Sequence, residues 1–484
     1  MSLLPLPEFE GWDATDMAAL LRTGQITPLE VLEAAQVRAH AHANINAIAM
    51  FHDDMAHAKA LRLSQIAQSQ RSSETEKAAL WGVPFALKDL GVALKGTITT
   101  HGCAFFKEAV AEFDSTLVQR YLAAGLNIFA KTTSPEFGQT ATTESKLFGN
   151  TLNPWDLSLS AGGSSGGAAA AVAAGILPVA HASDGGGSIR IPASHCGLFG
   201  LKPSRGRIPM GPSSLEGWMG LSCQHVISRS VRDSALILKL TQGDEAGTRS
   251  SPSQNFQNSP ATLRPLKIAL MLNNPFGVPV HPDCLEAVQK TAKLCESLGH
   301  HVEIAQPALA VGDMFGGMGI ATATGMLTQV QAREAALGRD ARQEEFEALN
   351  WRSLELAKQF TAVQVFKARS AFDQAGRTLD TFLSDYDCIL SPVTAAPPPR
   401  IGEMTLNQPY EDFVKVAMMA SPFTALFNMS GHPAMTVPLH WNAHNIPIGS
   451  HFAGRYGDED TLLALATQLE QAAPWKDKRP KASK

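Results

Sequence analysis

Apolar residues along the chain fall in short runs, separated by longer stretches in which apolar positions recur every three or four residues. The runs LWGVPFALKDL (80–90) and LNIFAKTT (126–133) have the length and composition of buried strands. Between them, a helical segment extends from about Ser115 to Ala124, and Gly125 is suited to end it. Two apolar strands joined by a helix predict a core of β-α type.

A second unit of the same kind lies in the C-terminal half. PLKIALML (265–272) and HHVEIA (300–305) are predicted strands, and the stretch 283–298 between them is a predicted helix. The order strand, helix, strand predicts a β-α-β unit. The helix carries apolar residues at helical spacing, at Leu285, Val288, Ala292 and Cys295.

Helical patterning dominates the start of the chain and the region after the second unit. The chain opens with a helical pair, and its second helix begins with the capping box Thr27-Pro28-Leu29-Glu30, with Pro at the first helical position. A last pair of strands is predicted within FTALFNMSGHPAMTVPL and IPIGSHFAGR. The other predicted elements are helices at 14–22 and 27–43, mostly helical structure over 313–385, a buried strand at 387–392 and a closing helix at 458–471.

Polar stretches suggest how the chain is organised. The segment 68–77 has the composition of a surface loop, and 241–263 is the best candidate for a joint between subdomains. We expect an N-terminal helical region at 1–75, a core segment at 76–240, and the second half of that core at 241–484. The two halves of the core are expected to form one continuous domain.

The composition narrows the class of protein. Of 484 residues, 44% are hydrophobic and 18% are charged, and the formal net charge of −5 gives no reason to expect nucleic acid or an anionic membrane as a partner. No signal peptide is visible at the N-terminus, and no uncharged apolar stretch reaches the roughly 20 residues that span a bilayer. We therefore expect a cytoplasmic protein with no membrane contact.

The cysteines show no CxxC or other metal-ligand spacing. We expect reduced, mostly buried thiols and no bound metal. The six are Cys103, Cys196, Cys223, Cys284, Cys295 and Cys388.

One stretch, residues 153–207, concentrates the candidate chemistry. It holds two glycine-rich loops, GGSSGG (162–167) and DGGGS (184–188), with an alanine-rich run between them that is built to be buried. Glycine-dense loops bring backbone N–H groups close to a bound group. Ser164 and Ser188 lie inside these loops, and we interpret the stretch as an active site.

A serine hydroxyl is a weak nucleophile until a neighbouring base takes its proton. A lysine can be that base if burial depresses its pKa, because desolvation disfavours the ammonium form. Lys88 follows an apolar run and is therefore predicted at the end of a buried strand. From the residues alone, a structural pairing of Lys88 with Asp89 or another carboxylate is favoured over a catalytic role.

The motifs around these residues resemble the amidase signature family. The likeness is carried by GGSSGGAAAAVAAG, SDGGGSIRIPASHCGLFGLKPSRGRIP and GVPFALKD, and it extends over nearly the full chain. It implies the amidase signature fold, a single large α/β domain with a central twisted mixed β-sheet covered by helices on both faces. It also implies an amidohydrolase that acts on a small-molecule amide, linear or cyclic, at carbon–nitrogen bonds other than peptide bonds. No cofactor is implied, and a homodimer is possible.

The resemblance implies a Ser–cis-Ser–Lys triad at Ser188, Ser164 and Lys88. Ser188 would attack the carbonyl and form an acyl-enzyme. Ser164, held by a cis Gly163–Ser164 peptide, would relay the proton, and neutral Lys88 would accept it. The oxyanion hole is expected to consist of the backbone N–H groups of Gly185, Gly186, Gly187 and Ser188.

Weaker expectations concern the neighbours of the triad. Ser165 is expected either to hydrogen-bond within the triad or to cap the following helix. Asp184 and Arg190 are expected to form an ion pair that braces the nucleophile loop. Gly138 and Gln139 lie where the family lines its acyl pocket.

The loop Ser183-Asp184-Gly185-Gly186-Gly187-Ser188 departs from the common family pattern. Many relatives have a bulkier residue before the glycine pair, at the position of Gly185. The extra glycine is expected to leave the backbone donors intact and to enlarge the pocket. The triple-glycine form resembles the branch that contains cyclic-dimer hydrolases and assorted bacterial amidases.

Three rival interpretations remain. GGSSG at 162–166 fits the GxSxG nucleophile elbow, but no apolar strand precedes it directly. A non-enzymatic anion cradle lacks the GxxxxGK[ST] and GxGxxG motifs and leaves Lys88 without a role. The third rival is the glutaminase subunit of a tRNA-dependent amidotransferase, which would need partner subunits. The particular amide substrate does not follow from the sequence.

Overall fold

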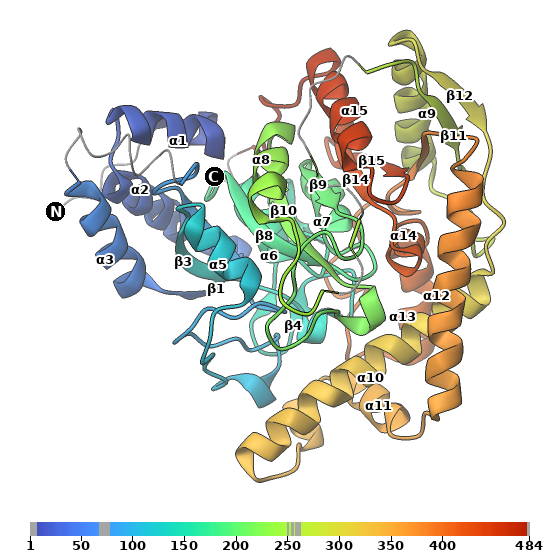
Figure 1. Cartoon of the computed structure of the whole chain (residues 1–484), viewed down its shortest axis with the longest axis horizontal. Coiled ribbons are helices and arrows are strands. Elements are labelled where there is room, and N and C mark those ends of the chain that lie inside the picture. The colour runs from blue at the N-terminus through green and yellow to red at the C-terminus, as the bar shows by residue number, and fades with distance from the viewer. Residues whose placement is uncertain (1–6, 67–77, 249–250, 253–255, 257–262, 482–484) are drawn as a thin grey trace.

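A computed structural model describes residues 7–66, 78–248, 251–252, 256 and 263–481. The predicted surface loop at 68–77 lies outside the described residues, and so does most of 249–262 within the predicted joint. Figure 1 shows α1, α2 and α3 at one end of the molecule, and α9, β11 and β12 at the other.

The centre of the fold is an eight-stranded mixed sheet, in the order β12-β11-β13-β15-β14-β9-β10-β8. β11 pairs in parallel with both β12 and β13, and the other neighbours are antiparallel. The strands are β8 (Val179–Asp184), β9 (Phe199–Lys202), β10 (Cys223–Ser228), β11 (Lys267–Leu270), β12 (His301–Ile304), β13 (Cys388–Pro392), β14 (Ala434–Trp441) and β15 (Pro447–Gly454).

Helices surround this sheet and form most of the remaining structure. The first half holds α1 (Ala14–Thr23), α2 (Pro28–Ala41), α3 (Asp53–Ser64), α5 (Thr116–Ala123), α6 (Gly166–Ala173), α7 (Arg190–Cys196) and α8 (Val231–Thr241). The second half holds α9 (Pro282–Ser297), α10 (Val311–Leu337), α11 (Ala348–Ala357), α12 (Ala362–Phe382), α13 (Tyr410–Ala420), α14 (Thr424–Ser430) and α15 (Glu459–Ala472).

Strand β15 shows that helices cover both faces of the sheet. Successive residues of a strand point to opposite faces. Gly449 of β15 lies against Ser194 of α7, whereas its neighbour Ser450 hydrogen-bonds Thr291 of α9 at 2.7 Å. α7 and α9 therefore pack on opposite faces, which confirms the expected α/β architecture.

A smaller sheet in the order β1-β3-β2 lies beside the edge strand β8. β2 and β3 pair in parallel, with α5 between them in the chain, as the first β-α unit predicts. The backbone N–H of Lys88, at the end of β2, donates to His181 Nδ1 of β8 at 3.1 Å. Lys88 therefore lies next to β8. The strands are β1 (Ile48–Phe51), β2 (Pro84–Lys88) and β3 (Asn127–Thr132), and short pairs follow at β4 (Glu144–Ser145), β5 (Gly149–Asn150), β6 (Leu152–Asn153) and β7 (Asp156–Ser160).

The second predicted unit is present as β11, α9 and β12, with the two strands parallel. The capping box of α2 is also present: Thr27 accepts the N–H of Glu30, and the Glu30 carboxylate accepts the N–H of Thr27. Ala168–Ala171 of α6 are fully buried, in agreement with the expectation that the alanine-rich run is packing.

Two regions differ from the sequence patterns. The N-terminal region contributes a strand, β1, which pairs with β3. Its residues are only half-buried, so its apolar pattern is weak. The stretch after Ser188, for which the sequence patterns predict no helix or strand, contains the helix α7 and the strand β9. α7 has only seven residues, too short for a helical period to be visible in the sequence.

All six cysteines are free and buried, as their spacing predicts. Among the described helices, none combines the length and the apolarity needed to cross a bilayer.

Candidate active site

Lys88 lies at the centre of a buried hydrogen-bond network. Its side chain is completely buried at the end of β2. Its Nζ lies 2.7 Å from Ser164 Oγ and 3.0 Å from Ser183 Oγ. These serines come from the loop before α6 and from β8, so three distant segments of the chain meet at one amine.

Burial lowers the pKa of Lys88 to about 7, although the nearby carboxylate of Asp184 works in the opposite direction. A substantial fraction of the amine is therefore uncharged near neutral pH. An uncharged amine has a lone pair and can accept the hydroxyl proton of Ser164. The pairing with Asp89 that the residues alone favour is not formed, since Asp89 accepts hydrogen bonds from Thr100 instead.

Ser164 is positioned by tight backbone packing. The Gly163–Ser164 peptide bond is cis, as expected. A Cβ on Gly163 would collide with the backbone of Thr142, so no larger residue fits before the serine. On the other side, a Cβ on Gly138 would lie 2.9 Å from Ser164 Oγ. Gly138 thus allows a second segment to approach the serine closely.

Ser188 lies in the loop between β8 and α7, and this loop is organised by Asp184. The Asp184 carboxylate accepts the N–H of Gly187 at 2.7 Å and the N–H of Ile189 at 3.1 Å. Arg190 donates to both carboxylate oxygens at 2.9 Å, so the expected ion pair is present. Both side chains are completely buried.

The electrostatics of this ion pair favour the charged carboxylate. Burial alone would raise the pKa of Asp184, but the Arg190 guanidinium and the hydrogen bonds of Asn428 hold that pKa well below its ordinary value. Arg190 also donates to Thr424 O and Asn428 Oδ1. The carboxylate is therefore ionised at neutral pH and accepts the backbone N–H groups of the loop in its charged form.

One of the four backbone N–H groups that the sequence predicts as oxyanion donors is already engaged within the loop. The N–H of Gly187 is already donated to Asp184. Within the described part of the chain, the N–H groups of Gly185, Gly186 and Ser188 have no acceptor. These three amides remain available to a bound group, while Gly187 supports the shape of the loop.

A cavity of about 940 Å³ opens at these residues. Ser164, Ser183, Gly185 and Ser188 are among the residues that line it. Ser188 and Ser164 therefore face one shared space, although no hydrogen bond joins their hydroxyls. Most of the wall is apolar and comes from the segment 90–113, the segment 210–222 and the helix α10, and His101, Phe137, Trp218 and Gln224 are among its larger side chains.

The pocket is not enlarged at Gly185, contrary to the sequence-based expectation. A Cβ on Gly185 would lie 2.5 Å from Cζ3 of Trp218. The volume that a side chain would take at Gly185 is filled by the indole ring of a residue that lies 33 positions later. The sequence pattern could not reveal this replacement because the two residues meet only in the folded chain.

The other candidate residues occupy different places. Ser165 Oγ donates to Ser183 O at 3.1 Å and accepts the N–H of Ser183 at 3.3 Å, and it makes no capping bond to α6. Its hydroxyl supports Ser183, which contacts Lys88, and forms no hydrogen bond with the side chain of Lys88 or Ser164. Gln139 does not line the cavity, whereas its neighbour Phe137 does.

Ser183 is the functional candidate that the sequence patterns did not single out. Its hydroxyl is the second partner of Lys88 Nζ. The sequence signal for Ser183 is its position directly before Asp184, at the end of the strand β8 that leads into the glycine-rich loop.

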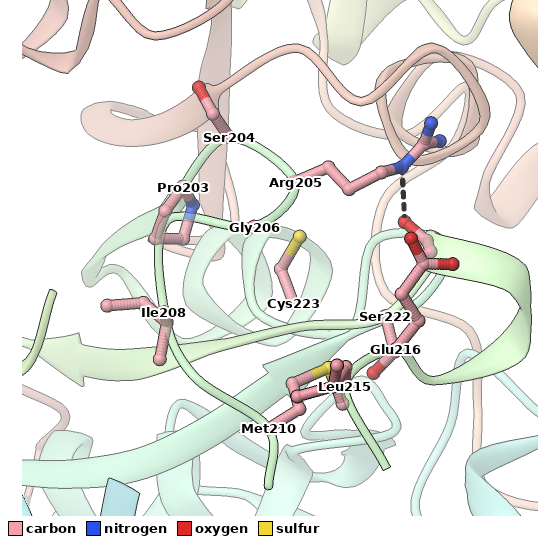
Figure 2. A pocket seen from close by; sticks show the side chains of 11 residues that line it. Pro203, Ser204, Arg205, Gly206, Ile208, Met210, Leu215, Glu216, Ser222 and Cys223 are labelled. Carbon is pink, nitrogen blue, oxygen red and sulfur yellow. Dashed lines mark hydrogen bonds between the residues drawn. The ribbon is translucent and has the colours of Figure 1, made fainter. Parts of the chain in front are cut away.

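No cluster of three or more His, Cys, Asp or Glu side chains suited to a metal was found among the described residues. A second, much smaller cavity of about 30 Å³ is lined by residues of the segments 203–210 and 215–223. Figure 2 shows it between Cys223, Met210 and Arg205, with the Arg205 side chain reaching a backbone carbonyl of the second segment. Its size suits about one water molecule rather than a substrate.

Comparisons with known proteins show the family of the chain. The profile of the Amidase family matches residues 30–463. The chain is 35% identical to the 6-aminohexanoate-cyclic-dimer hydrolase of Paenarthrobacter ureafaciens, over 97% of this chain and 96% of that protein. It is 32% identical to the acylamidase of Rhodococcus erythropolis, over 96% of each chain.

The solved structures give the same result. The structure of a 6-aminohexanoate cyclic dimer hydrolase complexed with substrate superposes with a TM-score of 0.88 at 32% identity. The match covers 98% of this chain and 99% of that one. The likeness therefore extends over nearly the whole fold.

Proposed function

The chain belongs to the amidase family, and we propose that it hydrolyses a small-molecule amide through an acyl-enzyme formed on Ser188. Membership in the family makes it a hydrolase of amide carbon–nitrogen bonds other than peptide bonds. The residue roles and the substrate are the proposal. The observation that carries it is the contact of 2.7 Å between the buried Lys88 amine and Ser164.

In the first half of the reaction, Ser188 Oγ attacks the amide carbonyl carbon. Its proton passes to Ser164 Oγ, while the Ser164 proton passes to the uncharged Lys88 amine. The carbonyl oxygen takes up negative charge, and the N–H groups of Gly185, Gly186 and Ser188 stabilise it. The carbon–nitrogen bond then breaks, the amine leaves with the proton returned through Ser164, and an ester remains on Ser188.

In the second half, water attacks the ester carbonyl and gives its proton to the same serine–lysine relay. The oxyanion forms again against the same amides. When the carbon–oxygen bond to Ser188 breaks, the proton returns to Ser188 Oγ and the carboxylic acid is released. No cofactor enters either half of this scheme.

The relatives favour a free-standing hydrolase over an amidotransferase subunit. The two curated relatives carry hydrolase and acylamidase names, and each is matched over nearly its full length. The large, mainly apolar cavity is suited to a substantially hydrophobic amide rather than to the small polar side chain of glutamine. We propose a cytoplasmic enzyme, active by itself or as a homodimer.

The purified protein tests this proposal. A fluorophosphonate probe should modify Ser188, located by peptide mass spectrometry, and should abolish turnover of aryl, linear aliphatic and cyclic amides. The protein alone should turn over at least one of these amides without a partner subunit. Modification at Ser164 would favour the nucleophile elbow, and a strict need for partner subunits would favour the amidotransferase.

A further inference from the structure

Trp218 fills a slot between two glycines from distant parts of the chain. Gly185 belongs to the loop that carries Ser188, and Gly325 belongs to the helix α10. A Cβ on Gly185 would lie 2.5 Å from Trp218 Cζ3, and a Cβ on Gly325 would lie 2.6 Å from Trp218 Cδ1. Real Cβ atoms do not approach a ring so closely. The indole therefore needs glycine on both sides.

The backbone itself does not require glycine at either position. Neither Gly185 nor Gly325 has a positive φ, so other residues could adopt these conformations. Gly325 lies well inside a helix of 27 residues, where glycine is an unfavourable choice. The space occupied by the Trp218 ring is thus the physical reason that the structure offers for both glycines.

The backbone of Trp218 is held in an unusual conformation. Trp218 has φ 52° and Met219 has φ 55°, in the left-handed region that bulky residues rarely adopt. Arg205 Nε donates to Gly220 O at 2.7 Å, which is the dashed contact in Figure 2. Arg369 Nη1 donates to Met219 O at 3.1 Å. Two arginines from separate segments therefore fix this turn.

The slot borders the reaction site. Trp218, Gly185 and Gly325 all line the cavity that contains Ser164 and Ser188. The ring also lies against the loop whose amides are proposed as oxyanion donors. A bulky side chain in this place reduces the space next to the carbonyl that Ser188 attacks.

We infer that Trp218 is the specificity-determining residue of this enzyme, and that it restricts the site to amides with unbranched groups next to the scissile bond. The inference rests on the proposed hydrolysis at Ser188. The inference goes beyond the proposed hydrolysis because it names the residue that selects the substrate and the substrate shape that this residue favours. The long remainder of the cavity leaves room for the distal part of such an unbranched chain.

Matched anilides test the selection on the acyl side. The ratio of kcat/KM for pivaloyl anilide to kcat/KM for pentanoyl anilide is measured in the wild type and in Trp218→Ala. The amine side is tested in the same way with the N-cyclohexyl and N-hexyl amides of pentanoic acid. Intrinsic reactivity cancels when the ratios of the two proteins are compared.

We expect Trp218→Ala to raise the ratio of kcat/KM for the branched amide to kcat/KM for the unbranched amide at least tenfold in one or both series. Trp218→Phe should raise this ratio less. Ratios that stay within twofold of the wild type in both series would overturn the inference. Failure of the wild type to hydrolyse any slender amide would instead contradict the proposed function. The two failures are therefore distinguishable.

The slot itself is tested by a rescue experiment. Gly325→Ala should lower kcat/KM for pentanoyl anilide at least tenfold, because the new methyl group displaces the ring. The double variant Gly325→Ala/Trp218→Ala should recover most of the rate that Gly325→Ala loses. Gly316→Ala on the same helix is the control, since a Cβ there meets nothing within 4 Å.

Two outcomes would show that the ring does not depend on the slot. The first is a double variant that is no faster than Gly325→Ala alone, and the second is a Gly325→Ala protein that is as active as the Gly316→Ala control. Circular dichroism and thermal unfolding of each variant separate a local effect from loss of the fold. Trp218→Ala only removes atoms, so the ratio measurement remains decisive if Gly325→Ala does not fold.

Discussion

The carboxylate of Asp184 accepts the backbone N–H of Gly187, three residues further along the loop formed by residues 184–188, at 2.7 Å. This contact occupies one of the four backbone N–H groups predicted as oxyanion donors, so three remain available to a bound group. It also ties the loop to the fully buried Asp184–Arg190 ion pair. The buried ion pair therefore holds the backbone of the loop that carries the proposed nucleophile.

Asp184→Asn should destabilise the protein, because it leaves the Arg190 guanidinium buried without a counter-charge. Breaking a buried pair in this way typically costs about 3–5 kcal/mol of unfolding free energy. Urea unfolding measures the effect. Glu286→Gln is the matched control, since it breaks an exposed i,i+4 pair with Lys290, which solvent screens and which contributes little to stability. Equal losses in the two variants would contradict the structural role of the buried pair.

The rate should depend on pH through Lys88. Burial lowers its pKa to about 7, and only the uncharged amine can accept the serine proton. Activity should therefore be low below pH 6, rise through about pH 7 and level off above pH 8. Measuring kcat/KM between pH 5 and 10 with a neutral amide checks this, and a flat profile from pH 6 to 10 would argue against a lysine base.

Lys88→Met should retain the apolar stem without the amine and lose several orders of magnitude in kcat. Ser164→Ala should behave similarly, because it interrupts the relay between Ser188 and Lys88. Ser188→Ala should abolish amide hydrolysis. Pre-steady-state and steady-state rates with one anilide, compared across these variants, provide the measurement. Near-normal turnover by Ser188→Ala would exclude it as the nucleophile.

Ser183→Ala tests the residue that the sequence patterns did not single out. It removes the hydrogen bond of 3.0 Å to Lys88 Nζ but leaves Ser164 in place. We expect a smaller loss of kcat than in Ser164→Ala, together with a shift in the pH of half-maximal rate, because the amine loses a fixed partner. Ser370→Ala on the exposed face of α12 is the control. An unchanged pH profile in Ser183→Ala would mean that Ser183 does not tune the base.

Glu136 should make stability fall as the pH rises. Its carboxyl is buried beside Phe137 and accepts hydrogen bonds from the Glu347 N–H and from Asn350. Burial raises its pKa from 4.5 to about 7. The folded state therefore binds this proton more tightly than the unfolded state does. The resulting stabilisation is complete below about pH 4.5 and is lost as the pH rises through about 7.

Thermal unfolding between pH 5 and 8 measures this effect. Tm should fall more steeply with pH in the wild type than in Glu136→Gln, whose amide stays neutral throughout. Glu344→Gln, at an exposed position, serves as the control. Parallel Tm curves for the wild type and Glu136→Gln would show that this carboxyl does not titrate as its burial requires.

The sequence by itself determined the alternation of strands and helices and indicated the residues that we propose as catalytic. Apolar runs bounded by glycine, and the two glycine-rich loops, are local patterns, and they placed Lys88, Ser164 and Ser188 on the correct elements. The half-buried strand β1 and the short helix α7 escaped detection because their patterns are too weak or too short for a period to be visible.

Only the tertiary structure decided how those elements meet. Ser183 reaches Lys88 because β2 lies beside β8, although 95 residues separate the two in the chain. Trp218 replaces a side chain at Gly185 because the turn at 218–220 and the helix α10 converge on the nucleophile loop. Such contacts depend on packing between distant segments, and no local pattern of residues encodes them.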